Sequence, residues 1–214
     1  MTRFVLVASL CAACGGGTVT TKVDSGLHAD AGASFDLAGA DLAGADLAGV
    51  DLASPSSPDL SMGPVAGEPP ALTGITAAHN SARAQAMPAP SPALPPLTWS
   101  ATLAQTAQSW ADGCVFQHSM GMYGENLYAS AGSTPTGAGV TQDWVSEASS
   151  YDYATDSCSG VCGHYTQVVW RATTMLGCAV KACSQNSPFA GYSDWTIVVC
   201  EYDPPGNYIG QKPY

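Results

Sequence analysis

The chain has 214 residues, 17 of them acidic and only 6 basic, which gives a formal net charge of −11. This balance excludes a surface built to bind nucleic acid, whose phosphates require clustered lysine and arginine. Seven of the acids lie between Asp24 and Asp59, so the remainder of the chain is only mildly acidic.

Residues 1–14 have the layout of a secretory signal peptide. Arg3 precedes a short apolar run from Phe4 to Leu10, and small residues follow; the run is too short to span a bilayer. Cys14 stands behind two alanines and ahead of three glycines, as at the cleavage site of a bacterial lipoprotein, but Cys11 occupies the usual leucine position of that motif. We expect export, with lipidation of Cys14 and plain cleavage as the two alternatives.

Residues 15–69 are dominated by glycine, alanine, aspartate, serine and proline. The pentapeptide DLAGA occurs at Asp36 and Asp41, and the repeat continues as DLAGV at Asp46 and DLASP at Asp51. A period of five matches neither a helix nor a strand, and the regularly spaced carboxylates repel one another. The pattern predicts a disordered, solvated linker and disfavours a calcium-binding repeat, since single aspartates between apolar residues do not converge on an ion.

Residues 70–214 are long enough to bury a core, and helical periodicity marks their first half. A helix is predicted over Thr73–Ala86, with His79 inside its apolar stripe. A second helix is predicted after Ser100, a favourable N-cap residue, with Leu103 among its apolar positions.

A third predicted helix carries Val140, Trp144 and Glu147 at i, i+4 and i+7. Glu147 thus continues an apolar face. Because an ionised glutamate is almost never buried alone, this position requires a partner.

After Cys158 the periodicity changes to two. His164 to Arg171 alternates in this way, a shorter run contains Cys178 and Val180, and Trp195 to Tyr202 follows. Helices first and strands last predict an α+β domain with a mainly antiparallel sheet covered by helices. The absence of a glycine-rich phosphate loop from the sequence argues against a nucleotide-binding fold.

The stretch GHYTQVVW at 163–170 places a histidine, a hydroxyl and an amide beside valine and tryptophan, where these groups need partners. The candidate partners of His164 are His79, Glu125 and Glu147. The four residues can form an internally satisfied polar core, as we expect for His118 by itself, or they can converge on one cation with ligand types that zinc accepts. Both interpretations stay open from the residues alone.

The domain contains six cysteines, an even number that indicates three disulfides in an exported chain. The sequence alone allows fifteen pairings. Cys158 and Cys162 also have a spacing that zinc ligands can have, but an exported protein favours disulfides. The six positions are Cys114, Cys158, Cys162, Cys178, Cys183 and Cys200.

Four motifs together resemble the CAP superfamily, or SCP domain, which includes cysteine-rich secretory proteins, venom allergens and plant pathogenesis-related proteins of group one. The resemblance covers the whole of 70–214 and is strongest to the plant branch, down to the terminal QKPY. Residues 1–69 have no counterpart in the core of the family and suggest a bacterial surface protein. The motifs are HNSAR at 79–83, GENL at 124–127, GHYTQVVW at 163–170 and CEYDPPGNY at 200–208.

This resemblance implies a three-layer α-β-α sandwich with a cleft formed by His79, Glu125, Glu147 and His164 that holds a divalent metal such as Zn²⁺. No other cofactor is implied. It also implies structural hydrogen-bonding roles for Asn80, Arg83, Asn126, Gln167 and the PPGN turn at 204–207. The disulfide pairs that it implies are Cys114 with Cys183, Cys158 with Cys162, and Cys178 with Cys200.

The function that the resemblance implies is a secreted, monomeric binding module for a sterol, a fatty acid, another apolar ligand or a partner. Alanine-rich helices and the aromatic loop Tyr151 to Tyr153 favour an apolar ligand. The alternative is a hydrolase in which Glu125 or Glu147 serves as base and a bound water as nucleophile. A purely structural surface protein is the third class. The expected location is extracellular or at the cell surface (outer surface or periplasm if lipidated), with membrane attachment only through Cys14.

Overall fold

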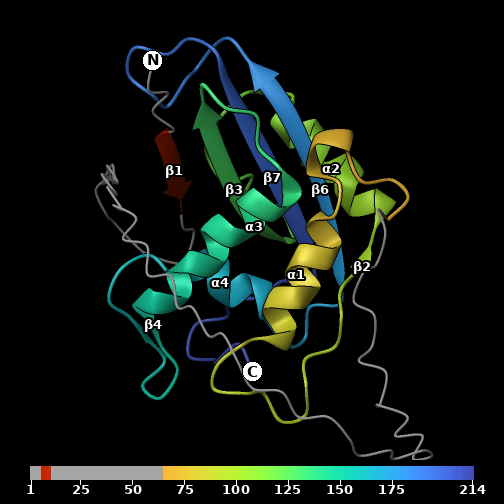
Figure 1. Cartoon of the computed structure of the whole chain (residues 1–214), viewed down its shortest axis with the longest axis vertical. Helices are drawn as coiled ribbons and strands as arrows, with labels where there is room; N and C mark the ends of the chain where they lie inside the picture. The colour runs from red at the N-terminus through yellow and green to blue at the C-terminus, as the bar shows by residue number, and fades with distance from the viewer. Residues whose placement is uncertain (1–5, 11–64) are drawn as a thin grey trace, which may run out of the picture. The chain divides into compact units, whose positions relative to one another are not determined.

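The computed structural model describes residues 6–10 and 65–214, with side chains only from residue 65 onward (Figure 1). Cys14 and the DLAGA repeats therefore lie outside the described residues. The last part of the predicted linker, residues 65–69, is described, and there the Glu68 carboxylate accepts from the amides of Gly74 and Thr76 at the start of helix α1 (Ile75–Ala84). No helix in the described part of the chain is long and apolar enough to cross a membrane.

A five-stranded sheet is the centre of the domain. Its strands follow the order β1-β3-β7-β6-β2 and pair antiparallel, except that β2 runs parallel to β6. A separate hairpin joins β4 to β5. The strands are β1 (Leu6–Leu10), β2 (Thr98–Trp99), β3 (Gly124–Ala131), β4 (Tyr151–Asp152), β5 (Ser157–Cys158), β6 (Met175–Cys183) and β7 (Trp195–Asp203).

Helices cover both faces of this sheet. On one face α1, α3 and α4 bury Trp144, Val168 and Tyr202, and on the other α2 packs Ala107 against the sheet (Figure 1). The predicted α+β, three-layer architecture is confirmed. The helices are α1 (Ile75–Ala84), α2 (Ala101–Ala111), α3 (Gly137–Ser146) and α4 (Gly163–Val168), with short 3₁₀ helices η1 (Pro70–Leu72) and η2 (Glu147–Ser150).

The first three predicted helices are present close to their expected places. Ser100 caps α2, since its hydroxyl accepts a hydrogen bond from the Leu103 amide. Gly177 lies inside β6. A Cβ there would come within 2.2 Å of the Ala104 amide nitrogen, so glycine lets α2 approach the sheet closely.

The strand predicted at His164 to Arg171 is wrong, because residues 163–168 form α4. All six residues of α4 are buried, so the alternation of polar and apolar residues does not correspond to two faces of a sheet. The Glu147 carboxylate accepts hydrogen bonds from the amides of His164 and Tyr165 in the first helical turn. A long-range cap of this kind stabilises a helix in a sequence rich in β-branched residues.

The sequence analysis did not predict β3. Residues Asn126 to Ala131 are all buried, because helices cover both faces of the sheet. Burial on both sides removes the period-two pattern by which a strand is recognised.

All three disulfide pairs that the resemblance implied are present. Cys178–Cys200 joins directly opposed residues of β6 and β7, and Cys158–Cys162 closes a short loop before α4. Cys114–Cys183 links the segment after α2 to the end of β6 across 69 residues. Since loop-closure entropy grows with loop length, this last bridge should contribute most, about 4 kcal/mol.

Arg83 joins α1 to the end of α4 and to the segment that follows it. Its guanidinium donates to the carbonyl oxygens of Pro95, Val168, Trp170 and Thr173 at 2.8–3.3 Å, and only 1% of the residue is exposed. Burial lowers the pKa of Arg83 to about 10, so the group remains charged at neutral pH. The structural role implied for Arg83 is confirmed.

We predict that Arg83→Lys lowers the free energy of unfolding by about 2–4 kcal/mol, because an ammonium cannot reproduce the planar fork and leaves buried carbonyls unpaired. Urea unfolding measures the loss. Arg171→Lys is the matched control, since Arg171 donates to Pro92 in an exposed contact and should cost less than about 1 kcal/mol. Equal losses in the two variants would contradict this role.

Candidate functional site

His79 is a buried structural residue of α1. The carbonyl of Ile75 can only accept, so Nδ1 carries the proton and donates to it at 2.8 Å. Nε2 then accepts from the Tyr202 hydroxyl at 2.9 Å. Burial lowers the pKa of His79 to about 4, so the ring is neutral at physiological pH. Both ring nitrogens are thus engaged inside the core.

Glu147, one of the three candidate partners, pairs with His164. His164 Nδ1 lies 2.7 Å from Glu147 Oε1, and the other carboxylate oxygen accepts from the His164 amide. The His164 ring stacks on Trp144 with 6.0 Å between ring centroids. One carboxylate therefore orients the imidazole and also caps the helix that carries it.

Glu125 is paired with His118 and not with His79. His118 Nδ1 lies 2.7 Å from Glu125 Oε1, which also accepts from the Ser119 amide at 2.9 Å. Burial raises the pKa of Glu125, but the hydrogen bonds from His118 and Ser119 outweigh it and bring the pKa below its usual value. Sequence reasoning treated His118 as an isolated group; its place seven residues before Glu125 was the available signal.

Glu201 is a second residue that sequence reasoning missed. It lies directly across from Glu125 in the β3–β7 ladder and is 2% exposed. Burial and the charge of Glu125 raise the pKa of Glu201 to about 8, so its carboxyl is protonated at neutral pH and can donate to Glu125. A single charged residue within the apolar run WTIVVCEY was the signal in the sequence.

A chain of hydrogen bonds connects His79 to the backbone of His164. Asn126 Nδ2 donates to the Tyr202 hydroxyl and to the His164 carbonyl, both at 3.1 Å. Tyr202 in turn donates to His79. His79 therefore acts on the site through Tyr202 and Asn126, as a positioning group.

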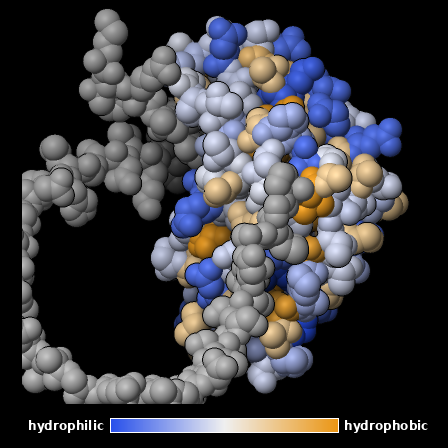
Figure 2. Space-filling model, turned by 45° about the vertical axis from the view of Figure 1, so that its right-hand side comes forward, coloured by the Kyte–Doolittle hydropathy of each residue, from blue (hydrophilic) through white to orange (hydrophobic). Residues whose placement is uncertain are grey.

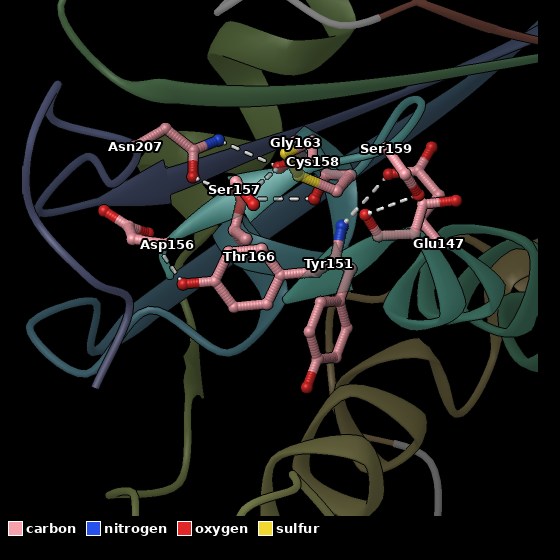
Figure 3. Close-up of a disulfide and its surroundings, with 12 residues drawn as sticks. Glu147, Tyr151, Asp156, Ser157, Cys158, Ser159, Gly163, Thr166 and Asn207 are labelled. Atoms are coloured by element: carbon pink, nitrogen blue, oxygen red, sulfur yellow. Dashed lines mark hydrogen bonds between the residues drawn. A yellow bond between two sulfur atoms is a disulfide. The ribbon is translucent and has the colours of Figure 1, made fainter. Parts of the chain in front are cut away.

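The other residues of the motifs are hydrogen-bonded as their implied structural roles require. Asn80 exchanges two hydrogen bonds with the backbone of Leu97, and Gln167 accepts from the Gly206 amide. Figure 3 shows Asn207 beside the N-terminus of α4, where it accepts from Thr166 and donates to the Gly163 carbonyl.

The same view shows the Cys158–Cys162 loop next to Glu147 (Figure 3). The Ser159 amide donates to the Ser150 carbonyl at 2.8 Å, which holds this loop against η2, the helix that begins at Glu147. The loop thus holds the start of α4 close to the carboxylate that caps it.

The predicted metal set is only partly brought together. Glu147 contacts His164, whereas Glu125 contacts His118 and His79 is bonded to Ile75 and Tyr202. Within residues 65–214 there is no group of three or more histidine, cysteine, aspartate or glutamate side chains that could hold a metal ion.

The fold and these contacts define an α-β-α sandwich with two carboxylate–imidazole pairs. Residues 76–202 match the CAP: Cysteine-rich secretory protein family. The chain belongs to this family, whose homologues are secreted, extracellular proteins.

Plant proteins are among its relatives. Pathogenesis-related protein 1 of Arabidopsis thaliana is 44% identical over 141 residues, which cover 64% of this chain and 78% of that protein. The basic form of pathogenesis-related protein 1 of Nicotiana tabacum is 45% identical over 141 residues, with 64% and 71% covered.

Solved structures agree on the fold. Venom allergen-like protein 4 of Schistosoma mansoni has a TM-score of 0.52 at 25% identity and covers 66% of this chain and 91% of its own. The crystal structure of NaASP2 with Zn²⁺ has a TM-score of 0.50 at 27% identity, with 65% and 82% covered.

The neutral state of buried His79 predicts a specific loss of stability in acid. The unfolded chain takes up a proton at His79 near its ordinary pKa of 6.5, but the folded protein does so only near 4. As the pH falls through this window, His79 should therefore lower the free energy of unfolding by about 3 kcal/mol in total. Urea unfolding at several pH values between 7 and 4 measures this loss.

His79→Gln keeps a polar side chain that does not titrate and should flatten this dependence, although the variant is less stable at pH 7. Parallel pH profiles for the two proteins would show that His79 is not the titrating group.

Proposed function

We propose that this protein is a secreted, non-enzymatic binding module that holds an apolar ligand, a fatty acid or a sterol, in a groove between α1 and α3. The observation that carries the proposal is the groove itself. Its volume is about 540 Å³, within the range of about 300–1,000 Å³ typical of small-molecule sites.

Small side chains on the facing helices leave this space open. Alanines line it from both sides, and the phenol rings of Tyr151 and Tyr165 close one end. Larger residues at the alanine positions would fill the gap between the helices, as side chains do in an ordinary core. The alanine positions are Ala78, Ala82, Ala86, Ala138 and Ala148.

The character of the lining favours an apolar ligand with one polar end. Ala82, Val145 and Tyr151 are partly buried hydrophobic residues packed against the core. Ser81, Gln85 and Gln142 supply the few polar groups. On the part of the face in Figure 2 that is not drawn in grey, hydrophobic residues are dispersed among hydrophilic ones.

The amino-terminal pattern supports export and attachment to a bacterial surface. Under this proposal Cys14 is the point of lipidation, and residues 15–69 are the tether that carries the domain away from the membrane. The domain itself is expected to be monomeric.

We predict that Ala138→Trp reduces binding of a fluorescent fatty acid and of radiolabelled cholesterol at least about tenfold, because the indole occupies the groove. Ala138 is exposed at the start of α3, so the fold should tolerate the change. Fluorescence titration and filter binding measure the two ligands.

Ala101→Trp is the matched control, since Ala101 is also an exposed alanine in the first turn of a helix, α2. It should bind both ligands like the wild type. Unchanged binding by Ala138→Trp, or absence of binding by the wild type, would refute the groove as the site.

A divalent cation and hydrolysis remain hypotheses, and we give neither a role in the proposed binding. NaASP2 has been crystallised with Zn²⁺, and this likeness is the observation that favours the cation. The cation hypothesis predicts that zinc raises the Tm of the wild type but not that of Glu147→Gln, which keeps the volume and loses the charge.

Differential scanning calorimetry with and without zinc decides this point, and an unchanged wild-type Tm would contradict the cation. Asp194→Asn, at an exposed loop position, controls for the loss of one charge. Turnover of an ester or peptide substrate that is lost in Glu147→Gln or Glu125→Gln would instead favour the hydrolase.

A further inference from the structure

A second pocket lies on the other flank of α3. Its volume is about 400 Å³, and it is an open pocket lined by α3, by Tyr128 of β3 and by the loop between them. It shares only Gln142 with the lining of the apolar groove. Its polar lining consists of Tyr128, Thr134, Thr136, Gln142, Asp143 and Ser146.

Asp143 is the one charged residue in this lining among the described residues. Burial raises the pKa of its carboxyl, the neighbouring charge of Glu147 adds to this, and only the opposing effect of His164 favours ionisation. Within residues 65–214 no side chain donates a hydrogen bond to the Asp143 carboxylate. An ionised group that is half-buried among neutral oxygens and near a second carboxylate is stabilised by a cation.

Tyr128 lines the same pocket as Asp143. Burial raises the pKa of the Tyr128 hydroxyl, and the charge of Asp143 adds to this. The electron-rich ring of a tyrosine beside a carboxylate is a recurrent arrangement for binding an organic cation.

We propose that this pocket binds a small organic ammonium group, with the Asp143 carboxylate as its counter-ion and Tyr128 as its aromatic wall. The surrounding hydroxyl and amide oxygens accept hydrogen bonds from a primary ammonium or contact the methyl groups of a quaternary one. A bare divalent cation is a poorer fit, because it requires several oxygen ligands and the lining offers a single carboxylate. This site is independent of the apolar groove.

Isothermal titration calorimetry of the whole chain with choline tests the proposal. The comparison ligand is 3,3-dimethyl-1-butanol, which has the same shape with carbon in place of nitrogen and carries no charge. We expect saturable binding of choline, at least about tenfold weaker binding of the neutral alcohol, and a similar loss of choline binding in Asp143→Asn. Ethanolamine in place of choline extends the test to a primary ammonium.

Asp194→Asn removes the same charge at an exposed position and should bind choline like the wild type. The proposal is overturned if choline does not bind the wild type, if the alcohol binds equally well, or if Asp143→Asn keeps full affinity. The comparison of choline with the alcohol uses wild-type protein alone, so it decides even if Asp143→Asn does not fold.

Vesicles of phosphatidylcholine distinguish a lipid headgroup from a free amine. Flotation of the wild type but not of Asp143→Asn with these vesicles would assign the ammonium to a headgroup, whereas binding of soluble choline alone would assign it to a small metabolite. Both outcomes support the site. Fatty-acid binding by Asp143→Asn should stay unchanged, so failure here and failure of the groove are separate results.

Discussion

The Glu147 carboxylate is the contact on which the arrangement of the site depends. It sits where α3 passes into η2, accepts the first amides of α4 and orients the His164 imidazole. A helix of six residues is too short to be stable alone, so this cap, the Cys158–Cys162 loop and Asn207 hold it at its N-terminal end. Because the buried face of α3 fixes the position of Glu147, α4 has a fixed capping residue at its N-terminus.

Two carboxyl groups face each other across strands β3 and β7, and only one of them is ionised. Of the two carboxyls that face each other on β3 and β7, Glu125 has hydrogen-bond donors from His118 and Ser119 and stays ionised, while Glu201 keeps its proton. Two ionised carboxylates at this separation would repel each other inside the core, whereas one shared proton turns the repulsion into a hydrogen bond. Burial likewise disfavours the charged form of His79, and its neutral ring serves as both hydrogen-bond donor and acceptor.

Sequence patterns predicted the parts of this fold in which one face is buried and the other exposed. The helices at α1, α2 and α3 belong to this class, and the motif spacing supplied the family and the three disulfides. The strand at β7 is buried on both faces and was predicted from its run of β-branched and aromatic residues. Periodicity failed for β3 and α4, since neither has an exposed face to create a period. The pairing of Glu125 with His118 depends on how the segment before β3 turns back, and periodicity carries no information about such a turn. Helical spacing could therefore not predict whether His79 or His118 contacts Glu125, although it correctly placed His79 on a buried face.

Helix α3 contributes residues to three different sites. Toward α1 it presents Ala138 and Val145, which leave an apolar groove. Toward β3 it presents Asp143 in a polar pocket, and at its end Glu147 leaves the helix to hold α4. Because Asp143 and Glu147 are one turn apart, the charge of Glu147 adds to burial in raising the pKa of Asp143, and a cation bound at Asp143 would oppose this repulsion. The described lining of the apolar groove contains no charged residue, so binding there is outside this electrostatic coupling.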